Sequence, residues 1–175
     1  MEKSDYIYDI NLTYDKDKLI SEMEYVNFHP FNDLGPEQQG VSKIPEGHWF
    51  HNPPTWLLGH VRVDLEGQSE ISKLKVQLRE LFNSHDIRPR FYKQEANTAV
   101  PMHADTGTLS AVNIVLTEDS GPIEFEDIGL VNYDCALIDT QKRHGVPAHS
   151  KERVLLKFSM FDITFNECKE NIINK

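Results

Sequence analysis

From residue 87 onward the chain is a succession of short extended segments, and this pattern limits the folds that are open to it. The segments cover residues 88–95, 99–103, 109–116, 122–126, 135–139 and 153–165. Turn-forming residues stand between them, for example at 97–98, 105–107 and 119–121. Many short strands joined by tight turns are typical of a β-barrel or a β-sandwich.

The residues before this region carry the helical signals. Residues 6–14 alternate in a way that predicts a strand, and apolar residues at helical spacing predict a helix over 16–26. The strongest helix prediction covers 69–84, because apolar residues recur there at steps of three and four. Residues 29–60, rich in proline and histidine, are predicted to be mostly loop. An extended run over residues 56–65 closes this loop.

Together these patterns predict one domain, residues 1–175, that is mainly β with flanking helices. Residues 1–86 are expected to form helices and loops that support the barrel. The barrel itself is expected over 87–165, with a C-terminal tail at 166–175. The aromatic and proline-rich part of residues 29–60 is a candidate lid or wall on the substrate side.

The charge balance excludes several classes of function. With 18 basic and 28 acidic residues, the net charge of −10 argues against a nucleic-acid binder or an anionic-membrane binder that uses a broad basic surface. No run is long enough to span a membrane, and two cysteines give no disulfide framework, so a cytoplasmic protein is expected. The charge is uneven: residues 117–139 hold seven acidic and no basic side chains, whereas residues 140–160 hold five basic and one acidic.

His103 and Asp105 form the first candidate for chemistry. Positions i and i+2 of a strand project to one face, so an imidazole and a carboxylate can converge on one ion. A surface or turn pair is the alternative, because this short pattern also arises by chance. Further along, His144 starts the triplet His-Gly-Val, and Arg153 opens the longest alternating run of the chain. Two histidines and one aspartate are the ligand set of the two-His-one-carboxylate facial triad.

The order His-x-Asp, His-x-Val and Arg over short strands resembles the Fe(II)- and 2-oxoglutarate-dependent oxygenase superfamily. Pro101-Met102 leads into the first motif, and the segment 121–125 resembles the stretch that the family places between its ligands. The resemblance spans residues 88–163 and comes closest to the prolyl and aspartyl/asparaginyl hydroxylases. It implies a double-stranded β-helix, the cupin-like jelly roll, with an N-terminal helical buttress.

The resemblance also implies roles for individual residues. His103, Asp105 and His144 would bind Fe(II), and Arg153 would bind the distal carboxylate of the co-substrate 2-oxoglutarate. Many members carry a polar residue two positions after this arginine, where this chain has leucine. Tyr92 is therefore the candidate second donor, with an ordinary strand aromatic as the alternative. In addition, Lys157 shares strand parity with the arginine and could face the pocket.

The implied reaction uses O2 to hydroxylate an unactivated C–H bond of a small molecule or a protein side chain, with succinate and CO2 as co-products. Two alternatives remain. One is a cupin-type metal enzyme that does not use 2-oxoglutarate and has no need of Arg153. The other is a non-catalytic jelly-roll binding module in which His103 and Asp105 only cap a turn.

Three further residue groups have alternative interpretations. His149 competes with His144 as a ligand, but the His-x-Val context and the spacing to the arginine favour His144. A metal role for His48 and His51 is disfavoured, because the surrounding prolines and glycine oppose a helix that would bring them together. Cys135 is predicted to be a small core residue rather than a nucleophile.

Overall fold

The structure is a computed structural model that describes residues 1–30, 56–60 and 69–175, in which two antiparallel sheets carry the fold. The larger sheet has the order β1-β9-β6-β11-β4-β3-β2 and the smaller one the order β5-β10-β7-β8. The strands of the larger sheet are β1 (Ile7–Asp9), β2 (Phe28–Pro30), β3 (Trp56–His60), β4 (Ile87–Gln94), β6 (Ser110–Val115), β9 (Cys135–Ile138) and β11 (Arg153–Met160). The strands of the smaller sheet are β5 (Val100–His103), β7 (Ile123–Phe125), β8 (Gly129–Val131) and β10 (His144–Val146).

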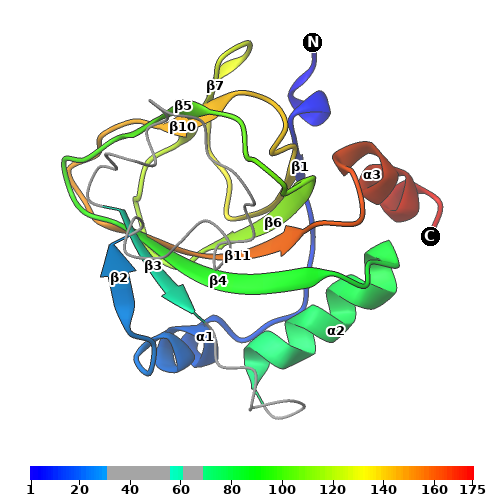
Figure 1. Ribbon diagram of the computed structural model, residues 1–175, viewed down its shortest axis with the longest axis horizontal. Helices are drawn as coiled ribbons and strands as arrows, with labels where there is room; N and C mark the ends of the chain where they lie inside the picture. The colour runs from blue at the N-terminus through cyan, green and yellow to red at the C-terminus, as the bar shows by residue number, and fades with distance from the viewer. Residues whose placement is uncertain (31–55, 61–68) are drawn as a thin grey trace.

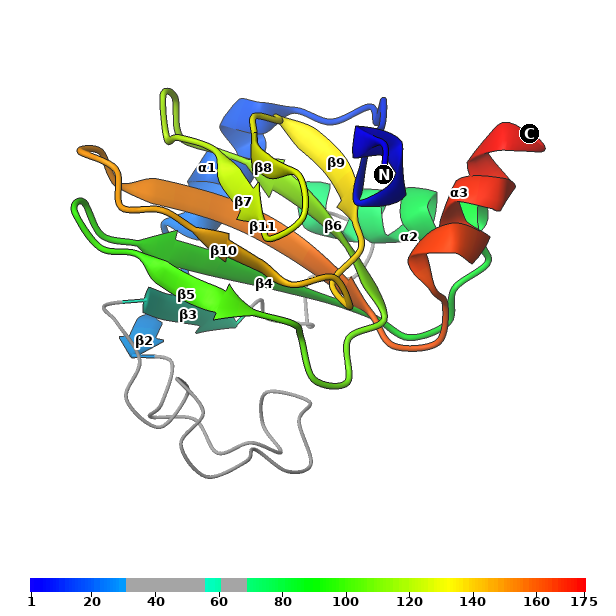
Figure 2. The same cartoon turned by 90° about the horizontal axis from the view of Figure 1, so that it is seen from above.

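The two sheets and the helices form layers. Figure 1 shows the smaller sheet above the larger one, and helices α1 (Lys16–Met23) and α2 (Glu70–Phe82) below the larger sheet. Seen from above in Figure 2, β5, β10 and β7 lie in front of β11 and β4. This arrangement of antiparallel sheets confirms the predicted mainly-β jelly roll with flanking helices.

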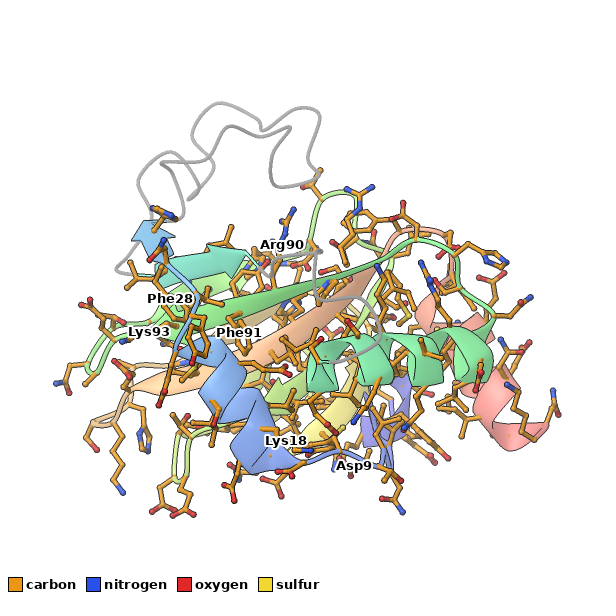
Figure 3. The ribbon with its side chains drawn as sticks, turned by 90° about the horizontal axis from the view of Figure 1, so that it is seen from below. Asp9, Lys18, Phe28, Arg90, Phe91 and Lys93 are labelled. Atoms are coloured by element: carbon orange, nitrogen blue, oxygen red, sulfur yellow. The ribbon has the colours of Figure 1, made fainter. Side chains whose placement is uncertain are left out.

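The main core lies between the larger sheet and the helices. The apolar face of α2 presents Leu74, Leu78 and Phe82, which are fully buried against strand residues such as Phe91 and Phe158. Figure 3 shows α1 and α2 covering this face of the sheet. Because side chains alternate along a strand, the residues next to these in β4 and β11 point the other way, into the space between the sheets.

The start of α2 is held by two side chains. The Ser69 hydroxyl caps the helix by accepting a hydrogen bond from the Ser72 backbone at 3.0 Å. The Glu22 carboxylate of α1 accepts from the backbone nitrogens of Glu70 and Ile71 at 2.5 and 3.2 Å. A carboxylate at a helix N-terminus satisfies donors that have no partner within the helix. The two supporting helices are thereby tied together.

The structure differs from the sequence-based expectation in several elements. Residues 1–86 contribute three strands to the larger sheet in addition to helices: β1 and β3 lie within the segments predicted to be extended at 6–14 and 56–65, whereas β2 was not predicted. Most of residues 166–175, expected to be a tail, belong to helix α3 (Phe165–Ile173), whose N-cap Thr164 and Glu167 form a capping box. The last barrel strand accordingly ends at Met160 instead of continuing to residue 165. Strand β8 was not predicted.

Two smaller points concern the described residues. None of their helices is long and apolar enough to cross a membrane. Cys135, at the start of β9, is a partly buried thiol that packs against the main core. Burial, together with the neighbouring Asp134 and Asp9 carboxylates, raises the pKa of Cys135 to about 12, so its protonated, weakly nucleophilic form prevails.

Candidate metal centre

The two histidines of the predicted triad lie opposite each other in the smaller sheet. In the pairing of β10 with β5, His144 is the register partner of His103. Directly opposed residues share a face of the sheet, so both imidazoles point to the same side, and their ring centroids are 4.6 Å apart. Gly145 allows this close pairing, because a Cβ there would meet the Val100 carbonyl oxygen at 2.8 Å.

Asp105 completes the cluster from the turn after β5. Its backbone nitrogen donates a hydrogen bond to the Thr140 carbonyl at 2.9 Å, which ties this turn to the chain just before β10. Its Oδ1 atom lies 3.3 Å from His103 Nε2 and 3.5 Å from His144 Nε2. The ligand atoms of the three side chains all lie within 4.8 Å of one another.

Hydrogen bonds from the opposite ring nitrogens orient both imidazoles. His103 Nδ1 lies 2.7 Å from the Pro101 carbonyl oxygen, and His144 Nδ1 lies 2.7 Å from the Lys142 carbonyl oxygen. A carbonyl oxygen can only accept, so each Nδ1 carries a proton and each Nε2 faces Asp105. This arrangement leaves Nε2 as the atom that would bind a metal ion, with an outer hydrogen bond that fixes the ring.

The pKa values of Asp105 and His144 favour a carboxylate and a neutral imidazole at neutral pH. Burial disfavours the charged form of Asp105, but Lys157 and the two histidines outweigh burial and hold its pKa well below the usual range. Burial is the main reason why the pKa of His144 falls to about 4; Asp105 partly opposes this fall and His103 adds to it. A neutral imidazole nitrogen and a carboxylate oxygen are both acceptors, so a metal ion between them would satisfy both.

Lys157 supplies a cation on one side of this carboxylate. Its Nζ donates to Asp105 Oδ2 at 2.6 Å, and the two side chains are 15% and 13% exposed. Burial alone would lower the pKa of Lys157, but the Asp105 carboxylate and two nearby tyrosines raise it above its usual value. The ammonium therefore stays charged, and the two oxygens of Asp105 face different partners.

Arg153 lies at the first position of β11 and is 3% exposed. Its two terminal nitrogens donate to the Gly121 carbonyl and to the Tyr133 hydroxyl, both at 3.0 Å. The same hydroxyl accepts from Asn113 Nδ2 at 3.2 Å. Because two donors occupy the phenol oxygen, the hydrogen of Tyr133 remains available to donate to a further group.

Two buried polar atoms near Arg153 lack a partner. Among the described residues, the buried side-chain atoms without a hydrogen bond are Arg153 Nε and Asn113 Oδ1. Both residues line the same cavity as the metal cluster, together with Tyr92, His103, Asp105, Ile123, Tyr133, Ile138, Thr140, His144, Val146, Leu155 and Lys157. An unpaired buried donor is costly unless a ligand or water completes it, so this end of the cavity suits a polar, acceptor-bearing ligand.

The structure thus brings six predicted site residues to one cavity. They are Tyr92, His103, Asp105, His144, Arg153 and Lys157. His149 lies apart from the cluster and its Nδ1 accepts from the backbone of Lys151 at 3.2 Å, while His48 and His51 fall outside the described residues.

The sequence reasoning missed Asn113 and Tyr133. The Tyr133 hydroxyl accepts a hydrogen bond from Arg153. The departure at Leu155 predicted a second donor to the co-substrate carboxylate, with Tyr92 as the candidate; Tyr92 lines the same cavity, and its role stays a prediction. No spacing rule in the sequence points to a tyrosine in the connection between β8 and β9.

The low pKa of His144 predicts a pH dependence of stability. Unfolded, this imidazole takes up a proton near pH 6.5, whereas in the folded protein it does so only near pH 4. The contribution of His144 to the free energy of unfolding is therefore fully present above about pH 6.5. It decreases as the pH falls towards 4, by on the order of 1–3 kcal/mol. Urea unfolding of the metal-free protein across this range should show the slope. His144→Gln should flatten it and the exposed His85→Gln should not; equal slopes in all three proteins would contradict the prediction.

Comparisons with known proteins support this arrangement at the level of fold. No family model matches the sequence, and no curated protein does. The viral collagen prolyl hydroxylase of Paramecium Bursaria Chlorella virus-1, solved as a 2OG complex, is 12% identical, with a TM-score of 0.54 over 91% of this chain and 98% of that chain. A prolyl-4-hydroxylase of Pseudomonas putida is 15% identical, with a TM-score of 0.53 over 89% of this chain and 90% of its own. The chain therefore shares its fold with these two prolyl hydroxylases, which is the kind of fold that the order of its motifs predicted.

Proposed function

We propose that this protein is an Fe(II)- and 2-oxoglutarate-dependent dioxygenase that hydroxylates an unactivated C–H bond. In the balanced reaction, the substrate, 2-oxoglutarate and O2 give the alcohol, succinate and CO2. One observation carries the proposal: a single cavity contains a three-ligand cluster at one end and a buried arginine with an unpaired donor at the other. A metal-chelating ligand with a distal carboxylate matches both ends.

The three-ligand cluster fits Fe(II) in donor type and number. Two imidazole nitrogens and one carboxylate oxygen on one face leave three coordination positions for other ligands. His103, Asp105 and His144 would hold the ion, and the Pro101 and Lys142 carbonyls would keep the imidazoles oriented. When bound, Fe(II) and 2-oxoglutarate would supply the chemistry that couples decarboxylation to C–H oxidation.

The other end of the cavity fits a carboxylate. Arg153 offers a planar array of donors, and its Nε has no protein partner among the described residues. The Tyr133 hydroxyl would add a second donor, which replaces the polar residue that the family often has at the position of Leu155. Ile123 and Val146 line the same cavity and would exclude water around the bound chain.

The direct experiment measures succinate formed from 2-oxoglutarate by protein that has been loaded with Fe(II) anaerobically and then exposed to O2. Because both comparison proteins are prolyl hydroxylases, proline-containing peptides are the first substrates to add, followed by free amino acids. We expect 2-oxoglutarate turnover that requires Fe(II) and that His144→Ala abolishes. If the protein forms no succinate and binds no 2-oxoglutarate when it is loaded with Mn(II), the proposal is wrong.

Tyr133→Phe tests the carboxylate end separately from the metal end. The change removes the phenol oxygen that accepts from Arg153 and Asn113, together with the hydrogen that would reach the ligand. We expect 2-oxoglutarate to bind roughly tenfold more weakly to the Mn(II)-loaded protein, as for the loss of one charge-assisted hydrogen bond, with Mn(II) affinity unchanged. Isothermal titration measures both. Tyr25→Phe, at a side chain that is 85% exposed, is the control; equal affinities in the two variants would exclude Tyr133 from the site.

A further inference from the structure

Lys157 has a position that the proposed function does not by itself require. It lies on β11 with the same strand parity as Arg153 and Leu155, and its register partner on β6 is Asn113. Arg153 and Lys157 both line the inner cavity, which has a volume of about 40 Å³. That space is enough for only a few water molecules, so a five-carbon dicarboxylate requires a side chain to move.

The ammonium of Lys157 and a metal ion would compete for one carboxylate. Asp105 Oδ1 faces the two histidines, while Asp105 Oδ2 accepts the hydrogen bond from Lys157 at 2.6 Å. A divalent ion on Oδ1 would therefore lie within a few ångströms of the ammonium. In a buried site such a repulsion is weakly screened, so Lys157 opposes metal binding as long as it stays on Asp105.

Binding of a dicarboxylate would remove this opposition between the Lys157 ammonium and the metal ion. Among the described residues that line the cavity, Asp105 is the one carboxylate, and Arg153 and Lys157 are the two cations with full charges. Arg153 is held at the far end by Gly121 and Tyr133, so Lys157 is the cation beside the metal position. A carboxylate that arrives there would give the ammonium a new acceptor and compensate the charge of the metal.

We propose that Lys157 is a transferable counter-ion that couples metal binding to dicarboxylate binding. In the metal-free protein it pairs with Asp105. When a 2-oxo dicarboxylate binds to the metal-loaded protein, Lys157 moves its hydrogen bond to the carboxylate next to the metal. The inference rests on the proposed function, and it adds that each ligand strengthens the binding of the other. By thermodynamic linkage, the same factor must appear in both affinities.

The test measures binding and does not depend on turnover. The affinity for Mn(II) is obtained from the electron paramagnetic resonance signal of free Mn(II), with and without saturating 2-oxoglutarate. The affinity for 2-oxoglutarate is obtained by calorimetry on Mn(II)-loaded protein. We expect Lys157→Gln to bind Mn(II) alone about tenfold more tightly and to bind 2-oxoglutarate about tenfold more weakly, a coupling within the usual range for linked sites. A residue with a merely structural role would not change the two affinities in opposite directions.

Two further variants provide the controls. Lys157→Arg keeps the charge and should retain the wild-type pattern. Lys93→Gln removes the same charge from the neighbouring strand β4, where the ammonium pairs with Glu152 and lies 5.7 Å from the ring centre of Phe28. Figure 3 shows Lys93 and Phe28 beside each other near helix α1. This control should leave both affinities unchanged. Circular dichroism and thermal melts establish that each variant is folded.

The outcomes separate the two proposals. If the wild-type protein binds Mn(II) and 2-oxoglutarate, and Lys157→Gln changes both affinities in the same direction or neither, the counter-ion role is wrong and the proposed function stands. If the wild-type protein binds neither ligand, the proposed function fails and the counter-ion role fails with it. If Lys157→Gln does not fold, wild-type Mn(II) affinity that is independent of 2-oxoglutarate overturns the coupling.

Discussion

Replacing Asp105 with asparagine is expected to weaken Mn(II) or Fe(II) binding by roughly a hundredfold or more, since even outer-shell changes at metal sites cost about 10–100-fold. The change removes the only carboxylate of the ligand cluster and leaves Lys157 buried without its counter-ion. Breaking one partner of a buried ion pair costs roughly 3 kcal/mol, so the metal-free variant should also unfold at a lower urea concentration. Metal titration and urea unfolding measure the two effects.

Asp119→Asn is the matched control for this prediction. Asp119 also pairs with a lysine, Lys151, at 3.1 Å, but its side chain is 80% exposed. Exposed pairs contribute about 0–1 kcal/mol, so this variant should keep both the stability and the metal affinity of the wild type. Wild-type metal affinity in Asp105→Asn would show that the cluster is not a metal site, and would favour the binding-module alternative.

Arg153→Gln should abolish most 2-oxoglutarate binding while metal binding persists. Truncating one partner of a buried, hydrogen-bonded charge pair costs about 2–5 kcal/mol, so the affinity of the Mn(II)-loaded protein for 2-oxoglutarate should fall roughly a hundredfold. Arg153→Lys should give an intermediate loss, because it keeps the charge but lacks the planar donor array that fits a carboxylate. Calorimetry with 2-oxoglutarate measures the losses in both variants.

Arg143→Gln controls for the loss of a positive charge near the site. Arg143 pairs with Glu126 at 3.1 Å on the surface, where both side chains are 53% exposed. Its replacement should leave 2-oxoglutarate binding unchanged. Metal-dependent turnover that survives in Arg153→Gln without any requirement for 2-oxoglutarate would instead support the cupin-type enzyme, which has no need of this arginine.

Some helices and strands could be predicted from the spacing of apolar residues within their own segment. The three- and four-residue steps of Ile71, Leu74 and Leu78 predicted α2, because one helical stripe faces one core. The alternation after Arg153 predicted β11 in the same way, although that strand ends earlier than expected. Strands β8 and β10 were not predicted; β8 pairs with β7, and β10 pairs with β5 and β7, so these partners define them.

The same distinction applies to the candidate site: its residues could be named from the sequence, but their contacts could not. The sequence by itself indicated which residues would carry the proposed chemistry, because His103, Asp105, His144 and Arg153 stand in the motif order of the family that the chain resembles. Only the tertiary structure decided how they meet: His144 opposes His103 across β5 and β10, Tyr133 reaches Arg153, and Lys157 pairs with Asp105. The physical reason is that these contacts join residues far apart in the chain. Their geometry depends on the register of the paired strands and on the packing of the two sheets, and no local segment encodes either of these.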